Sequence, residues 1–196
     1  MTNKEKAMAL INTFATGDTE KAKELLASGY IQHNLAYGTG AEAFVGSVAY
    51  LASTPVKTTV NNIRAFEDVD KTEDNRELVR NFLVDVMQGK HPEKTPEYFE
   101  GDTYVQHNIG IADGQSGLGA ALEALDKQGI AMIYDTVHQV LAHGNYVLSV
   151  SEGTFGGAAT SYYDLWRVEN GKIAEHWDVM ETIAAKDTWA NENGKF

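Results

Sequence analysis

An aspartate and a histidine are the residues of this sequence best suited to acid–base chemistry, namely Asp164 and His107. Imidazole titrates near neutral pH, and burial among apolar side chains raises the pKa of a carboxyl group. Either property suits a group that removes a proton from a small molecule and later returns it. The alternative for the aspartate is a structural pairing with a strand neighbour or with Arg167. The alternative for the histidine is a structural hydrogen bond to backbone where a short strand ends.

The aspartate is placed by a hairpin signal. The pair Asn170-Gly171 lies between two strand-like segments and favours a two-residue turn. Such a turn pairs Asp164 with Trp177 across the hairpin and leaves it beside Trp166, on the more apolar of the two faces. A carboxylate in such surroundings is costly unless it is paired or protonated, and we therefore expect this face to line a pocket.

The same register puts His176 and Asp178 on the opposite face of the hairpin, because successive side chains of a strand alternate. In that arrangement neither residue shares a pocket with Asp164, and both belong to an interface or to solvent. A β-bulge would reverse this, and bulges are frequent in edge strands. Which face lines the pocket therefore stays open.

The elements around the hairpin predict an α+β fold, with helices packed on a curved antiparallel sheet. The residues from Ile130 to Thr182 favour strands, with a further turn at Gly156-Gly157. A capping box of Thr2 and Glu5 opens the first helix, which Gly17 ends. The other expected helices run from Thr19 to Ala27, from Ala41 to Leu51, from Asp70 or Thr72 onward, between Pro92 and Pro96, and from Ser116 to Lys127; a strand is expected from Lys57 to Phe66.

A repeated pentapeptide divides the chain. Tyr-x-Gln-His-Asn occurs at 30–34 and again at 104–108, in each case after a helical segment. The copy at 1–68 stops after a single strand, whereas the copy at 70–183 continues through three more strands. We therefore expect an incomplete first copy, a complete domain that holds any activity, and a polar surface tail at 184–196.

The composition excludes several classes of function. The net charge of −12 and the pI of about 4.8 disfavour nucleic acid and anionic membranes as partners. The absence of cysteine rules out thiol nucleophiles, disulfides and cysteine-based metal sites. No apolar run suggests a signal peptide or a membrane span, so a cytoplasmic location is expected. His138 and Glu152 lack ligand spacing, and we expect neither a metal nor a cofactor.

Three motifs resemble a known family: Tyr-Val-Gln-His-Asn at 104–108, Tyr-Asp-Leu-Trp-Arg at 163–167 and Glu-Asn-Gly-Lys-Ile-Ala-Glu-His-Trp-Asp at 169–178. Together they are similar to the SnoaL-like, polyketide cyclase-type branch of the nuclear-transport-factor-2-like (NTF2-like) superfamily. The resemblance implies a cone-shaped fold with an apolar pocket between helices and sheet. It also implies that Asp164 is a pocket carboxylic acid, as in ketosteroid isomerases, and that Asp178 is a second candidate acid or base.

The activity that the resemblance implies is proton abstraction next to a carbonyl group, leading to aldol-type cyclisation or isomerisation without a cofactor. The expected partner is a small apolar or carbonyl-containing molecule, and a homodimer is expected, which light scattering can test. The competing interpretation is a non-catalytic module that binds a small ligand or another protein. The residues expected to contact the substrate are Tyr104, Gln106, Trp166, Trp177, His176 and His138.

Overall fold

The computed structural model describes residues 1–55 and 66–196, which form two compact units. One unit comprises Met1–Arg64 with Ala184–Phe196, and the other comprises Ala65–Ile183. The strand expected from Lys57 to Phe66 lies, apart from its last residue, outside the described residues. None of the helices within the described ranges is both long and apolar enough to cross a membrane.

The first unit is helical. Thr2 and Glu5 form the expected capping box, with the Thr2 N–H donating to Glu5 Oε2 at 2.7 Å. Gly17 ends the first helix at a φ of 74°, a conformation that suits glycine. The apolar faces meet in a small core around Phe44 and Val48. The described residues of this unit form the helices α1 (Asn3–Thr16), α2 (Thr19–Leu25), α3 (Ala41–Ala52) and the short 3₁₀-helix η4 (Lys186–Thr188).

The C-terminal tail binds the loop that carries the first pentapeptide. The side-chain amide of Asn191 donates to the carbonyl oxygens of Asn34 and Tyr37, at 3.3 and 2.8 Å. Asn193 donates in the same way to the carbonyl oxygen of Gln32, at 2.8 Å. Asn191 is buried, as is Lys195. The expectation that the tail lies on the surface is therefore wrong for these two residues, because the polar tail satisfies backbone groups of the loop.

The second unit has the expected helices and an additional π-helical turn. The helix α4 is amphipathic, and Val79 and Phe82 on its apolar face are fully buried. The helix α5 begins two residues earlier than expected, at Gly114. The helices of this unit are η1 (Val69–Lys71), α4 (Thr72–Phe82), η2 (Leu83–Met87), η3 (Pro92–Glu97) and α5 (Gly114–Lys127).

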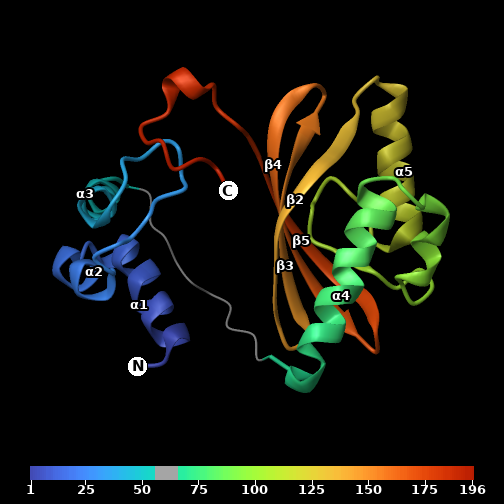
Figure 1. Ribbon diagram of the computed structural model, residues 1–196, viewed down its shortest axis with the longest axis horizontal. Helices are drawn as coiled ribbons and strands as arrows, with labels where there is room; N and C mark the ends of the chain where they lie inside the picture. The colour runs from blue at the N-terminus through green and yellow to red at the C-terminus, as the bar shows by residue number, and fades with distance from the viewer. Residues whose placement is uncertain (56–65) are drawn as a thin grey trace. The chain divides into compact units, whose positions relative to one another are not determined.

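A five-stranded sheet accompanies these helices, and Figure 1 shows α4 and α5 on one side of it. Four long strands form an antiparallel meander, and a two-residue strand pairs in parallel with the last of them. The expected α+β fold, with helices packed on a curved antiparallel sheet, is confirmed. The strands are β1 (Val105–Gln106), β2 (Met132–His143), β3 (Tyr146–Phe155), β4 (Ala158–Glu169) and β5 (Lys172–Thr182), in the order β1-β5-β4-β3-β2.

The hairpin between β4 and β5 begins as the sequence predicts. Asn170 and Gly171 both have positive φ angles, 52° and 72°, as a two-residue turn of type I′ requires. Glu169 accordingly pairs with Lys172. The turn at Gly156 and Gly157 likewise joins β3 to β4 with both residues at positive φ.

A β-bulge then changes the register of this hairpin. Val168 pairs with Ile173, but Arg167 pairs with Glu175, so Ala174 is one extra residue in β5. The regular register is therefore wrong beyond Ile173. Without the bulge, Ile173 and Glu175 would share a face, and a carboxylate would enter the apolar core that Ile173 occupies.

The bulge decides which residues of β5 face the helices. His176 now pairs with Trp166, and Asp178 pairs with Asp164, so these four side chains share the covered face. Trp177, expected on that face, pairs with Leu165 and lies on the other one. The alternative with a bulge, left open by the sequence, is the one that the chain adopts.

Candidate functional site

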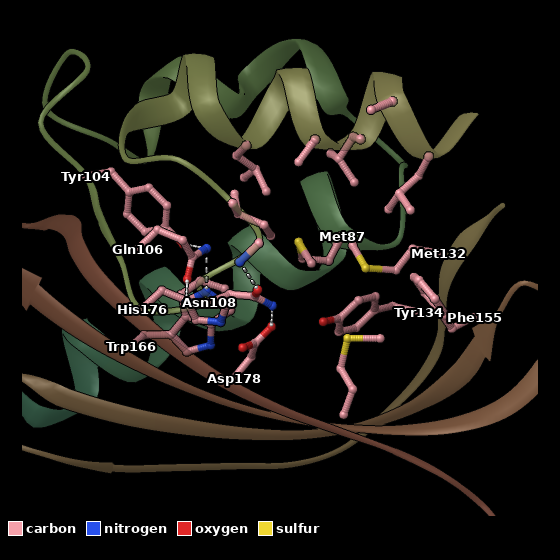
Figure 2. A pocket seen from close by; sticks show the side chains of 18 of the residues that line it. Met87, Tyr104, Gln106, Asn108, Met132, Tyr134, Phe155, Trp166, His176 and Asp178 are labelled. Atoms are coloured by element: carbon pink, nitrogen blue, oxygen red, sulfur yellow. Dashed lines mark hydrogen bonds between the residues drawn. The ribbon is translucent and has the colours of Figure 1, made fainter. Parts of the chain in front are cut away.

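A cavity of about 410 Å³ lies in the second unit, between α5 and the covered face of the sheet (Figure 2). Most of its wall is apolar, and three methionines give that wall adaptable side chains. A mainly apolar pocket with a few polar groups is the usual form of a small-molecule site. The apolar lining includes Phe82, Met87, Leu118, Leu125, Met132, Phe155 and Met180.

Three polar side chains of the cavity lie together at one end. Figure 2 shows Gln106, Asn108 and Asp178 together, away from Met132 and Phe155. Asp178 Oδ2 accepts a hydrogen bond of 2.8 Å from the side-chain amide of Asn108. The cavity can therefore hold a molecule with a polar group at one end and an apolar body at the other.

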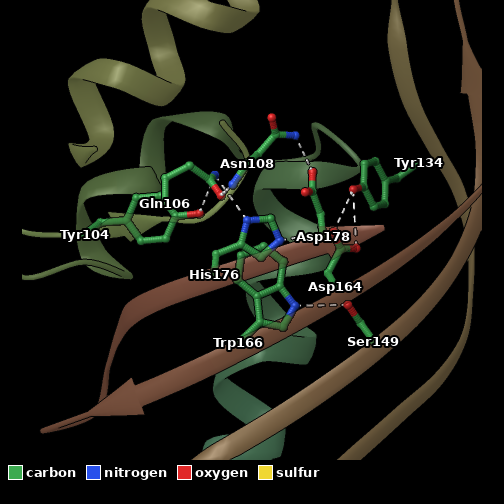
Figure 3. A network of polar contacts seen from close by, with 9 residues as sticks. All are labelled: Tyr104, Gln106, Asn108, Tyr134, Ser149, Asp164, Trp166, His176 and Asp178. Atoms are coloured by element: carbon green, nitrogen blue, oxygen red, sulfur yellow. Dashed lines mark hydrogen bonds and ion pairs between the residues drawn. The ribbon is translucent and has the colours of Figure 1, made fainter. Parts of the chain in front are cut away.

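Asp164 lies beneath this polar end. It is 1% exposed and is not among the residues that line the cavity. Its Oδ1 is 3.1 Å from His176 Nε2, and the Tyr134 hydroxyl donates to its two oxygens at 3.4 and 3.3 Å (Figure 3). His176 and Tyr134 both line the cavity, so Asp164 is connected to the cavity through its hydrogen bonds with these two side chains.

Burial raises the pKa of the Asp164 carboxyl group, although the hydrogen bond from His176 acts in the opposite direction. The nearby charge of Asp178 also raises it. The pKa of Tyr134 is raised well above its ordinary value, first by burial and then by the negative charge of Asp164. This phenol therefore remains a hydrogen-bond donor.

This raised pKa predicts how stability depends on pH. Folding favours the protonated carboxyl group, so the contribution of Asp164 to stability is fully present below its unfolded pKa of about 4. It is lost as the pH rises through the folded pKa. The free energy of unfolding of Asp164→Asn, relative to the unmodified protein, is therefore expected to increase over this pH range. Urea denaturation at a series of pH values measures it.

The matched control is Asp126→Asn, which changes an exposed aspartate of α5 and should show no such trend. A relative stability of Asp164→Asn that falls as the pH rises would contradict the prediction. That result would mean that the ionised carboxylate gains more from His176 than it loses by burial.

His176 is held by ring stacking and by contacts at both ring nitrogens. The ring stacks on Trp166 with centroids 3.9 Å apart and on Tyr104 at 6.3 Å. Its Nδ1 lies 3.2 Å from the amide nitrogen of Gln106. Trp166 is itself fixed, since its indole N–H donates to Ser149 Oγ at 3.0 Å. His176 is therefore a rigid link between the polar end of the cavity and Asp164.

His107, the expected partner of Asp164, lies elsewhere. Its ring stacks on Trp177 with centroids 4.5 Å apart, and its Nε2 is 2.7 Å from Glu175 Oε1. Glu175 also accepts a bond of 2.6 Å from Arg167, so Arg167 does not pair with Asp164. The structure therefore does not bring His107 and Asp164 together, and it places His107 with Trp177 outside the cavity wall.

The direction of β1 explains this separation. β1 pairs with β5, and the His107 N–H just beyond it donates to the His176 carbonyl oxygen at 2.9 Å. Successive side chains of an extended chain point to opposite sides. Gln106 therefore points into the cavity, and His107 points to the other face.

His138, expected to contact substrate, is also outside this cavity. Its Nε2 lies 3.0 Å from Glu152 Oε2, and it lines a separate polar hollow with Arg80 and Gln88. Among the described residues, no group of three or more His, Asp or Glu side chains is arranged to hold a metal ion.

Two residues of the site were not singled out from the sequence. Asn108 belongs to the pentapeptide motif, which was a usable signal, whereas Tyr134 lies in a strand without any motif. The expected residues that do line the cavity are Tyr104, Gln106, Trp166, His176 and Asp178.

Comparison with known proteins gives similarities of fold only. No protein-family model matches the sequence, and no curated protein matches it significantly. Among solved structures, an NTF2-like protein of unknown function from Mesorhizobium loti is 21% identical and covers 60% of this chain and 99% of its own, with a TM-score of 0.46.

Two other solved structures give similar values. An LEH-like epoxide hydrolase from M. tuberculosis is 21% identical, covers 57% of this chain and 85% of its own, and has a TM-score of 0.41. TsrD from Streptomyces laurentii is 18% identical, covers 56% of this chain and 89% of its own, and has a TM-score of 0.44. At these identities and TM-scores, the similarity says nothing about the reaction of this chain.

Proposed function

We propose that the protein is a small-molecule enzyme that removes a proton next to a carbonyl group, with Asp178 as the base. The observation that carries this proposal is a pair of carboxyl groups directly opposite each other on β4 and β5, in different surroundings. Asp178 lines the cavity, whereas Asp164 is buried beneath it with a raised pKa. Surroundings that differ in this way separate the roles of two carboxyl groups, so Asp178 can take up a proton from a bound molecule while the buried Asp164 acts only indirectly.

Asp178 is suited to accept the proton because it lines the cavity and is only partly buried. The amide of Asn108 holds one of its oxygens, which leaves the other for a substrate C–H. A base needs this kind of fixed position to react efficiently.

The enolate that forms needs a hydrogen-bond donor near its oxygen. The Tyr104 hydroxyl lines the cavity and accepts a bond of 3.1 Å from Gln106, so its own proton is oriented by that contact. Burial raises the pKa of Tyr104, which keeps the phenol protonated. Tyr104 is therefore the proposed donor that stabilises the developing oxyanion.

Asp164 acts through His176 in this proposal, as a positioning residue, and His107 has a structural role at the strand edge. The finer proposal is an aldol-type cyclisation or an isomerisation of the SnoaL-like type. Both reactions begin with the same enolate, so they share one first step and one test.

The test follows exchange of protons next to a carbonyl in heavy water. We would incubate the full chain with 2-tetralone, an apolar bicyclic ketone, and record loss of the α-proton NMR signal. The expected result is saturable exchange that is faster than in buffer. Saturable binding without faster exchange would overturn the enzymatic proposal and favour a non-catalytic ligand-binding module.

A further inference from the structure

The two ends of the Gln106 side chain are distinguished by their partners. Its Oε1 accepts a bond of 2.9 Å from the backbone N–H of Asn108. Its Nε2 donates to the Tyr104 hydroxyl at 3.1 Å and lies 3.2 Å from His176 Nδ1 (Figure 3). A backbone N–H can only donate, so the oxygen must face Asn108 and the NH₂ group must face the histidine.

The same turn forms in the first unit, which does not contain His176. In the first unit, Gln32 Oε1 accepts from the Asn34 N–H at 2.8 Å, and Asn34 Oδ1 accepts from the Ala36 N–H at 3.0 Å. In the second unit, Asn108 Oδ1 accepts from the Gly110 N–H, also at 3.0 Å. The orientation of the glutamine is therefore a property of the local turn and does not depend on His176.

This orientation determines where the proton of His176 lies. The NH₂ group of Gln106 donates to Nδ1, which must then offer a lone pair. The ring proton is therefore on Nε2, where it donates to Asp164. In the doubly protonated ring, the Nδ1–H would point at another donor, so Gln106 opposes that form.

We propose that Gln106 is a positioning residue that holds His176 neutral, with its proton on Nε2. The other titratable groups near His176 either oppose its neutral form or do not affect it. Asp164 and Asp178 favour a charged ring only in their ionised forms, and burial disfavours that form of Asp164, whereas the phenol of Tyr104 stays neutral. The consequence, which rests on the proposed function, is that His176 is not the base and that this role falls to Asp178.

Nitrogen NMR of the ¹⁵N-labelled full chain tests the proposal without any substrate. In the unmodified protein, we expect His176 Nδ1 to resonate as an unprotonated nitrogen and Nε2 as a protonated one at neutral pH. In Gln106→Glu, a carboxylate oxygen faces Nδ1 and accepts a proton from it. Both nitrogens are then expected in the protonated range at neutral pH.

The matched control is Gln32→Glu, which adds the same charge to the same turn in the other unit. It should leave the His176 signals unchanged. Gln106→Met removes the donor while keeping the length of the side chain, and serves if Gln106→Glu fails to fold. In that variant the ring should become protonated at higher pH than in the unmodified protein.

Two results would overturn the proposal. One is a doubly protonated His176 at neutral pH with Gln106 in place. The other is a pair of His176 signals that neither Gln106 variant moves. A lack of proton exchange with 2-tetralone would instead refute the proposed function alone, since the NMR signals report the ring nitrogens directly.

Discussion

Asp178→Asn is expected to slow proton exchange next to the carbonyl of 2-tetralone by about 10²–10⁴-fold, the usual contribution of a general base. Asparagine has nearly the same shape, and its oxygen can still accept the bond from Asn108. The amide cannot take up a proton at neutral pH. The exchange rate should therefore fall while binding of the ketone, measured by its NMR line broadening, changes little.

The stability of Asp178→Asn provides a control for its exchange rate. Asp164 and Asp178 are directly opposite on neighbouring strands, where like charges destabilise a sheet. Asp178→Asn should therefore fold at least as well as the unmodified protein, so a slow rate cannot be ascribed to unfolding. Asp126→Asn, an exposed change on α5, should exchange at the unmodified rate. An Asp178→Asn protein with full activity would exclude this residue as the base.

Trp166→Ala is expected to produce the largest loss of stability, about 3–5 kcal/mol in the free energy of unfolding. The indole is 2% exposed and packs edge-on against Phe82 with ring centroids 5.2 Å apart. It also stacks on His176 and donates to Ser149 Oγ, which is fully buried. Its removal leaves a large void and a buried hydroxyl without this donor. Urea denaturation gives the free energy directly.

Trp166→Phe separates packing from the hydrogen bond. It keeps one aromatic ring in the core but loses the indole N–H and part of the bicyclic surface, so a smaller cost of about 1–3 kcal/mol is expected. Val179→Ala is the matched surface change, since this residue of β5 is 64% exposed. A cost for Trp166→Ala no larger than that of Val179→Ala would show that the tryptophan does not hold the core together.

Turns and helix ends follow from the sequence because their interactions are short in range. The capping box of Thr2 and Glu5 and the turn at Asn170-Gly171 both form as predicted. Each depends on residues within three or four positions, so side-chain and backbone chemistry suffices. The α+β fold follows from the order of these elements.

The site could be predicted only in part because it depends on which face each strand presents. Ala174 carries no signal for a bulge, yet this one extra residue moves His176 and Asp178 to the face of Asp164. The bulge lets Ile173 join the core while Glu175 meets Arg167 on the other face. That choice balances two sets of distant contacts, which a local pattern does not contain.

The repeated pentapeptide shows most directly which features the local sequence determines and which depend on the tertiary structure. By itself, the sequence Gln-His-Asn determines a turn. In both copies, at 32–34 and at 106–108, the side-chain oxygens of the glutamine and the asparagine each accept from the backbone N–H two residues further on. Only the tertiary structure decides what the remaining groups contact. In the second unit, β5 lies opposite and supplies His176 and Asp178 to the two amides. The turn closes through bonds between near neighbours, whereas the contacts of the amides depend on a strand some 70 positions away.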